Sequence, residues 1–171
     1  MLIKSKDLET IKKLDLKHPY VWLATWFGSG FFRPAPGTWG SLFATPPALM
    51  IHELYGMAVF LMALAFITML GFWASERFEA ATDSHDNSMI VIDEAVGQWI
   101  TLIPVFVFYD VSALWVLVAF VLFRVFDITK PWPVSYFDRH VDGAAGVMMD
   151  DVVAGIMAAA VIVGAFYAGF G

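Results

Sequence analysis

The sequence contains no cysteine, and its 4 histidines show no spacing typical of metal ligands, such as His-x-x-x-His. The lack of cysteine excludes a disulfide framework, a zinc site built on thiolates and a cysteine nucleophile. The histidines are expected to be ordinary surface or interface residues. Any chemistry that the chain performs must therefore use oxygen and nitrogen groups other than a metal-binding histidine pair.

Charge is also scarce. Charged residues make up 15% of the chain, and the formal net charge of −6 argues against general affinity for nucleic acid. Hydrophobic residues make up 60%, and the mean hydropathy is +0.71. A soluble domain has roughly 45 to 50%. The composition predicts an integral membrane protein in which residues 1–171 form a single domain.

The apolar residues fall into runs at about 42–51, 57–75, 95–109, 111–123 and 152–170. Only the second and the last reach the roughly 18 to 20 residues that cross a bilayer unaided. The first run contains Pro46 and Pro47 and is expected to begin near Thr38 with a kink, because neighbouring helices can satisfy the carbonyls that proline frees. The predicted fold class is an all-α polytopic membrane helix bundle of about five short spans.

The third and fourth runs meet at Phe108-Tyr109-Asp110, which is either a turn between two spans or a polar break within one long element. The turn is the favoured interpretation. It places the segments 1–37, 76–93 and 124–151 on one side of the membrane.

The distribution of charge agrees with this arrangement. All 10 basic residues lie in those three segments, and 14 of the 16 acidic residues lie in them or, for Glu94, directly beside them, so that only Glu53 and Asp110 are on the opposite side. By the positive-inside tendency, this side is cytoplasmic and includes the polar N-terminal segment 1–20. A site assembled from distant parts of the sequence is therefore expected at the cytoplasmic membrane surface.

The first polar segment contains a glycine-rich stretch that ends with Gly37, Thr38 and Ser41. Glycine permits close backbone approach, and a helix N-terminus favours anions, so this stretch is a candidate phosphate cradle. Turn and capping chemistry explains the same residues, and no Walker lysine follows the glycines. Both interpretations remain open from the sequence.

The second polar segment ends with Asp93 and Glu94, followed by Gly97. One acid before an apolar helix complements the helix dipole. Two adjacent carboxylates near other acids favour a bound cation that offsets their repulsion, and oxygen ligands suit Mg²⁺ or Mn²⁺.

The third polar segment carries Arg124, Asp127 and Lys130 at the end of an apolar run, where charges are costly. On a continuing helix these residues would share a face, either as a structural ion-pair network or as part of a site. Asp150 and Asp151 close the segment, directly before the last run, where either is a candidate N-cap.

Several carboxylates with an arginine, a lysine and a glycine-rich turn at a lipid surface fit metal-assisted phosphoryl transfer on a lipid. The alternative is a small transporter or cation-binding membrane protein, whose acids would mark an ion path. Such a protein should carry acids at mid-span, whereas here they gather at one end of the expected spans.

The chain also resembles a known family, bacterial phosphatidylglycerophosphatase A, over nearly its whole length. The residues that carry the resemblance are Gly28-Ser29-Gly30, Pro36-Gly37-Thr38, Gly40-Ser41, Asp93-Glu94, Gly97, Arg124, Asp127, Lys130-Pro131-Trp132-Pro133, Phe137-Asp138, Asp150-Asp151 and Ala154-Gly155. The resemblance implies a Mg²⁺-dependent phosphatase of the bacterial inner membrane. It would remove the terminal phosphate of the phospholipid phosphatidylglycerophosphate and yield phosphatidylglycerol.

Taken with the resemblance, the residues divide into three expected roles. The expected metal ligands, with catalytic roles, are Asp93, Glu94, Asp127, Asp150 and Asp151. Arg124 and Lys130 are expected to bind the phosphate monoester, and Lys130, Asp138 and a metal-bound water are candidate general acids. Gly37, Thr38, Ser41 and Asp138 complete the expected substrate-binding set.

The reaction itself has two possible courses, direct attack by water or a transient aspartyl phosphate. The chain lacks the Asp-x-Asp-x-Thr pattern of aspartate-nucleophile phosphatases, which favours direct attack by water.

Overall fold

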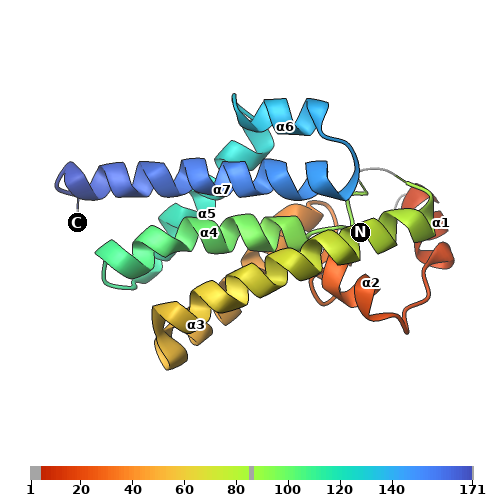
Figure 1. The fold of residues 1–171 in the computed structure, drawn as a ribbon, viewed down its shortest axis with the longest axis horizontal. Helices are drawn as coiled ribbons and strands as arrows, with labels where there is room; N and C mark the ends of the chain where they lie inside the picture. Colours follow the sequence, from red (N-terminus) through yellow and green to blue (C-terminus); the bar gives the residue numbers. More distant parts are fainter. Residues whose placement is uncertain (1–4, 85–86, 171) are drawn as a thin grey trace.

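The computed structural model describes residues 5–84 and 87–170, and this part of the chain is helical without a strand (Figure 1). The elements in chain order are α1 Ser5–Lys13, α2 Pro19–Ala24, the short 3₁₀ helix η1 Ser29–Phe31, α3 Pro36–Thr82, α4 Ile92–Phe108, α5 Ala113–Thr129, α6 Val134–His140 and α7 Gly143–Tyr167. The all-α prediction is confirmed. Residues 1–4 of the predicted N-terminal segment lie outside the described residues.

Helix α3 is a hairpin of two helices, 36–55 and 57–82. The backbone between them leaves the helical region at Gly56, with φ 78° and ψ 177°, and the ribbon doubles back there (Figure 1). Glycine adopts positive φ at no steric cost, and an added Cβ at Gly56 would meet nothing within 4 Å. Pro46 and Pro47 keep helical backbone angles, so the main break lies at the glycine instead of the prolines.

The predicted turn between α4 and α5 is confirmed. Helix α4 ends at Phe108 and α5 begins at Ala113. Ser112 is the N-cap of α5, and its hydroxyl oxygen accepts a hydrogen bond from the Trp115 amide at 3.4 Å. Asp110 therefore lies in a connection between two helices and does not interrupt one.

The three polar segments meet at one end of the bundle, which we call the polar end. Figure 1 shows α1, α2, α6 and the beginnings of α4 and α7 toward this end, and the Gly56 break, the α4–α5 turn and the C-terminus at the other. The Lys13 ammonium donates to the Thr82 carbonyl at 3.1 Å, which ties α1 to the end of α3. Segments far apart in the sequence are thus gathered as the sequence predicts.

Helix α7 begins at Gly143, well before the expected run 152–170. Asp142 takes the N-cap position, so the predicted capping role of Asp150 or Asp151 is wrong, since both lie inside the helix. The first turns of α7 are rich in alanine and glycine, and two aspartates interrupt the hydrophobicity there. Alanine is a strong helix former, but it adds little hydrophobicity to a run.

The outward faces of the bundle are apolar. On the second helix of α3, Met62, Phe66 and Met69 form an exposed stripe at helical spacing, while Phe60 and Leu64 are buried. Within the described residues, α3 and α7 are long and apolar enough to cross a membrane. These features indicate membrane association. Helices α4 and α5 have 17 residues each, a length of about 25 Å against a hydrocarbon core of about 30 Å.

Candidate active site

Helices α4 and α7 cross with their backbones in contact. A Cβ added to Gly97 would lie 2.6 Å from the Asp151 carbonyl oxygen, and one added to Gly155 would lie 2.5 Å from the Gly97 oxygen. The Thr101 hydroxyl, which donates to the Gly97 oxygen at 2.9 Å, also lies 3.3 Å from the Gly155 oxygen. Small residues permit this close approach between apolar helices.

The crossing brings three acids together, because Asp93 and Asp151 each precede one of these glycines by about one helical turn. Asp93, Glu94 and Asp151 each place one carboxylate oxygen within 4.8 Å of the others. Asp93 is 7% exposed and Asp151 3%. We call these three residues the carboxylate trio.

The carboxylate trio has unsatisfied oxygen atoms. Asp93 Oδ1 and Glu94 Oε2 are buried and have no hydrogen-bond partner within the described part of the chain. Buried carboxylates that repel one another and lack donors are costly unless a cation offsets their charge. Oxygen donors of this kind suit a hard divalent cation. The residues present therefore fit a metal ion.

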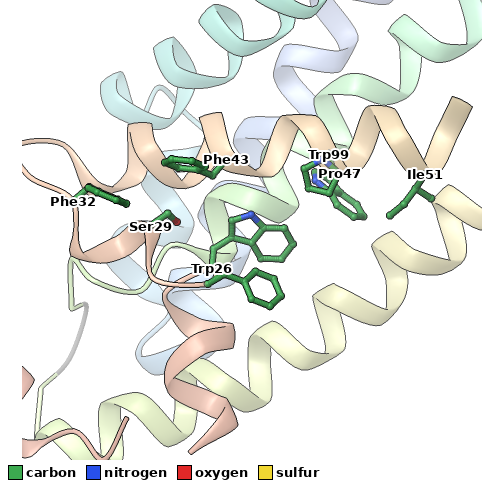
Figure 2. A pocket seen from close by; sticks show the side chains of 8 residues that line it. Trp26, Ser29, Phe32, Phe43, Pro47, Ile51 and Trp99 are labelled. Carbon is green, nitrogen blue, oxygen red and sulfur yellow. The ribbon is translucent and has the colours of Figure 1, made fainter. Parts of the chain in front are cut away.

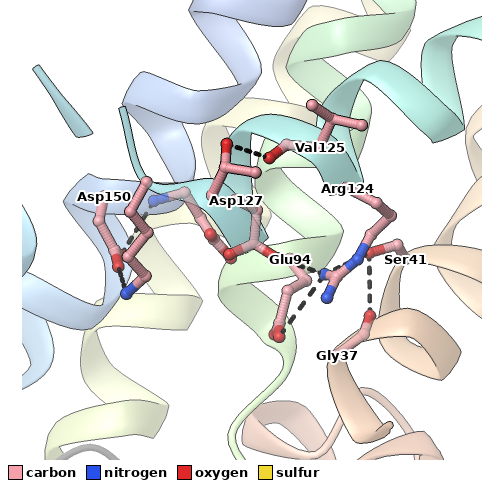
Figure 3. Close-up of polar contacts among 10 residues, drawn as sticks. Gly37, Ser41, Glu94, Arg124, Val125, Asp127 and Asp150 are labelled. Carbon is pink, nitrogen blue, oxygen red and sulfur yellow. Dashed lines mark hydrogen bonds and ion pairs between the residues drawn. The ribbon is translucent and has the colours of Figure 1, made fainter. Parts of the chain in front are cut away.

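Arg124, on the last turns of α5, connects the trio to α3. Its Nη1 donates to Asp127 Oδ2 at 2.6 Å and lies 3.9 Å from Glu94 Oε1. The same nitrogen donates to Ser41 Oγ at 3.3 Å (Figure 3). The Arg124–Asp127 pair has the helical spacing that the sequence predicts, and Arg124 contacts both Glu94 of the trio and Ser41 of α3.

The start of α3 packs directly on this group. The Ser41 hydroxyl donates to the Gly37 carbonyl at 2.9 Å. A Cβ on Gly37 would come within 1.9 Å of Glu94 Oε1, so only glycine fits there without a shift. Thr38 lies in the first turn of α3, whose N-cap is Ala35. The capping interpretation of Thr38 and Ser41 is therefore wrong, while the close backbone approach predicted for this stretch is present.

Lys130 faces a different pair of acids. It ends α5 in the left-handed region with φ 42°, which turns it away from the face that Asp127 shares with Arg124. Its ammonium pairs with Asp138 on α6 and donates to Asp150 Oδ2 at 2.8 Å. The predicted common face of Asp127 and Lys130 is therefore wrong.

These contacts fix the charge of Lys130. Partial burial by itself would lower the pKa of its ammonium, but the hydrogen bonds and negative charges of Asp138 and Asp150 outweigh burial and raise the pKa above its usual value. Lys130 is thus a permanent cation at neutral pH. Asp150 in turn accepts a hydrogen bond from the Asp151 amide at 2.9 Å, which links this pair to the trio.

The five predicted metal ligands thus fall into two groups. Asp93, Glu94 and Asp151 form the trio, whereas Asp127 and Asp150 lie outside this closest cluster and are paired with Arg124 and Lys130. With Asp138, six of the described carboxylates face Arg124 and Lys130 in this region, which leaves an excess of negative charge for a metal ion to offset.

The sequence also contains a signal for the crossing. Asp93 and Gly97 are four residues apart, and so are Asp151 and Gly155. A repeated acid and glycine at one-turn spacing on two apolar helices indicates a close crossing with the acids on the same side of it. Helix α6, which places Asp138 beside Lys130, has no comparable signal because it has only 7 residues.

The chain is similar to known proteins over most of its length. The sequence model of the family described as phosphatidylglycerophosphatase A matches residues 22–166. The chain is 42% identical to phosphatidylglycerophosphatase A of Haemophilus influenzae over 152 residues, which cover 89% of this chain and 91% of the relative. It is 36% identical to phosphatidylglycerophosphatase A of Escherichia coli over 166 residues, which cover 95% of this chain and 91% of the relative.

No solved structure matches the chain. The match to the family model includes every residue of the carboxylate trio, both cations and the start of α3. The chain belongs to the phosphatidylglycerophosphatase A family.

Proposed function

We propose that the chain is a Mg²⁺-dependent phosphatase that hydrolyses the terminal phosphate monoester of phosphatidylglycerophosphate to phosphatidylglycerol and inorganic phosphate. The observation that carries this proposal is the buried carboxylate trio at one end of an apolar bundle. Family membership supports the reaction class, a phosphoric monoester hydrolase, and the lipid substrate.

Asp93, Glu94 and Asp151 would hold the metal ion, with Asp127 and Asp150 at its periphery, directly or through water. The unpartnered oxygens of Asp93 and Glu94 support this assignment. Bound there, Mg²⁺ would neutralise charge on the phosphoryl oxygens and favour formation of hydroxide from water.

Arg124 and Lys130 would bind the phosphate monoester. Asp127 orients the Arg124 guanidinium, and Asp138 and Asp150 orient the Lys130 ammonium. Prepositioned cations of this kind stabilise charge that grows on the phosphoryl oxygens in the transition state. Ser41 Oγ, already within reach of Arg124, and the backbone from Gly37 through Thr38 to Ser41 would supply further contacts.

In the proposed reaction, the oxygen of water forms a bond to phosphorus while the bond to the glycerol oxygen breaks. The leaving alkoxide takes up a proton, for which Lys130 and Asp138 are the candidate donors. Direct attack by water is preferred to an aspartyl phosphate because the chain lacks the Asp-x-Asp-x-Thr pattern.

The proposed setting is the bacterial inner membrane. Residues 1–171 would form one domain with about five spans, the polar end and N-terminus facing the cytoplasm because all 10 basic residues belong to the polar segments. The alternative of a transporter would need acids along the middle of the bundle. Apart from Glu53 and Asp110, the described acids lie in or directly beside the three polar segments, which favours the phosphatase.

Phosphate release tests this proposal. Detergent-purified protein should release phosphate from phosphatidylglycerophosphate in the presence of Mg²⁺ and lose this activity reversibly when EDTA removes the metal. Release should be slower from phosphatidic acid and from a soluble phosphomonoester. Folded protein that releases no phosphate from any of the three would overturn the proposal.

A further inference from the structure

An apolar groove separates the first helix of α3 from α5. Its volume is about 510 Å³, and most of its lining is apolar. Residues along its two walls include Leu42, Thr45 and Leu49 on α3 and Ala113, Leu117 and Phe120 on α5. We call it the α3–α5 groove. Leu42 is 46% exposed and Leu117 57%, so the groove is open toward the outside of the bundle along its length.

The polar end of the groove lies about one helical turn from the candidate active site, since Thr45 and Phe120 line it and each is four residues from Ser41 or Arg124. Ser41, Thr45 and Leu49 recur at helical spacing on α3, and so do Arg124, Phe120 and Leu117 on α5. At the polar end the two walls touch through the hydrogen bond from Arg124 Nη1 to Ser41 Oγ. The groove therefore leads away from the proposed phosphate-binding arginine, starting about one helical turn from it, into the apolar part of the bundle.

The distance from Arg124 to the far end of the groove matches one leaflet of a membrane. The helical rise from Arg124 to Ala113 is about 16 Å at 1.5 Å per residue. The hydrocarbon core of a bilayer is about 30 Å thick, so this length is about half of it.

We propose that the α3–α5 groove holds one acyl chain of the substrate lipid while the phosphate lies at Arg124. This inference rests on the proposed function. A phospholipid has the same polarity as the site, with an anion at one end and an apolar chain that leads away from it. The open side of the groove would admit the chain laterally from the bilayer.

The groove would act mainly by orientation. Lipid tails are as apolar as leucine, so a chain gains little hydrophobic free energy when it moves from the bilayer into the groove. A chain that fits along the walls instead fixes where the headgroup lies, and correct placement of the reacting group is worth large factors in rate. The groove is therefore expected to favour lipids whose chains fill it.

A second apolar groove provides the control. Figure 2 shows Trp26, Phe43, Pro47 and Ile51 around it, on the other side of the same α3 helix. Its volume is about 440 Å³. None of the described residues that line it belongs to α5, the helix that carries Arg124, so a chain there would not lead along α5 to the proposed phosphate site. Ile51 and Leu49 are both partly buried on the same helix, which makes them a matched pair.

The test compares phosphatidylglycerophosphate with dioleoyl chains and with dihexanoyl chains. Leu49→Trp and Leu117→Trp would block the groove about 10 to 12 Å from the hydrogen bond that joins its two walls, beyond the reach of the short chains. Each should lower kcat/KM for the dioleoyl lipid by about tenfold, a factor in the range expected from misplacement of the reacting group, and leave the dihexanoyl lipid unaffected. Ile51→Trp should change neither value.

Three results would overturn the groove assignment: an equal loss on both lipids, no loss on the dioleoyl lipid, or the same loss with Ile51→Trp. A wild-type protein that releases no phosphate from either lipid would instead overturn the proposed function. If the tryptophan variants unfold, the wild-type protein is tested instead with an analogue of the dioleoyl lipid that carries a photoreactive acyl chain. The residues to which this chain becomes attached on irradiation are then identified. Attachment to residues of the α3–α5 groove supports the assignment, and attachment only elsewhere contradicts it.

Discussion

The α4–α7 crossing and the α3–α5 groove are contacts between apolar helices of the same bundle, and they differ in how closely the backbones approach. At the α4–α7 crossing, Gly97 and Gly155 let the two backbones touch, without room for a Cβ. Along the α3–α5 groove, bulky side chains such as Leu42, Leu117 and Phe120 line an open space of about 510 Å³.

Because the backbones approach closely at one contact and not at the other, the two contacts can serve different functions. The close crossing holds the carboxylates of Asp93 and Asp151 near each other despite their repulsion, because rigid backbones leave the acids no room to separate. The open groove leaves space for a flexible chain beside the same site. Rigid placement of the metal ligands and lateral access for lipid thus arise from different residue sizes on otherwise similar helices.

Removal of a carboxylate from the trio should have the largest effect. Asp151→Asn should lower kcat by about 100-fold to 1000-fold, since several kcal/mol of transition-state stabilisation depend on the metal ion. Phosphate release at saturating lipid measures this. Asp142→Asn, an equal change of charge at the exposed N-cap of α7, serves as the control and should retain activity. Near-normal turnover of Asp151→Asn at equal protein level would contradict its role as a ligand.

A substitution that pushes α4 and α7 apart at their crossing should have the next largest effect on activity. The new Cβ in Gly97→Ala would lie 2.4 Å from the Phe123 ring and 2.6 Å from the Asp151 oxygen. Overpacking of this kind costs about 1 to 3 kcal/mol of stability. We expect a lower melting temperature and a fall of about tenfold or more in kcat, because the trio would move apart.

The matched control for the crossing is Gly164→Ala on α7, where an added Cβ meets nothing within 4 Å. This variant should melt at or above the wild-type temperature and retain full activity, since alanine favours a helix over glycine. Equal behaviour of the two variants would show that the α4–α7 contact does not position the acids.

Loss of the Lys130 ammonium should weaken binding of the phosphate. Lys130→Ala is expected to lower kcat/KM by about tenfold, the usual scale for a charged hydrogen bond. Lys17→Ala removes an equal charge from an exposed residue at the polar end and should have little effect.

The pH dependence of this loss follows from the raised pKa of Lys130. A group whose pKa is higher in the folded state keeps its stabilising charge below its unfolded pKa and loses it only as the pH rises through the folded value. The ratio of wild-type to Lys130→Ala activity should therefore stay constant between about pH 6 and 9. If this ratio instead decreases as the pH rises from about 6 to 9, Lys130 is not held as a cation.

The smallest effect is expected from the hydroxyl that joins α4 to α7. Thr101→Val removes the hydrogen bond to Gly97 and the contact with Gly155, and should cost about 1 kcal/mol of stability. Thr68→Val removes a hydrogen bond within α3 alone and is the matched control. Thermal melting should show a larger decrease in melting temperature for Thr101→Val than for Thr68→Val. The reverse order would contradict a stabilising role of the Thr101 hydroxyl between α4 and α7.

Much of the fold could be predicted because apolar runs and charge positions follow from the chemistry of a membrane. The α4–α5 turn and the polar end are examples. The beginning of α7 could not, since alanine and glycine form helix without adding to an apolar run. The sequence favoured a kink at Pro46 and Pro47, whereas the backbone leaves the helical region at Gly56.

The site was predictable as a set of residues but not as an arrangement. Charges at the end of apolar runs indicated Asp93, Glu94 and Arg124 because such charges are costly without a function. The pairing of Lys130 with Asp150, 20 residues away, depends on the left-handed end of α5 and on the early beginning of α7. Neither feature has a signal in the residues that it brings together.

The most direct test of the metal centre is Mn²⁺ binding to purified protein in detergent, measured by electron paramagnetic resonance. The wild type should bind Mn²⁺ in competition with Mg²⁺, Asp142→Asn should bind it equally, and Asp151→Asn should bind it at least about tenfold more weakly. Equal affinity of Asp151→Asn and the wild type would contradict a metal centre built on Asp93, Glu94 and Asp151.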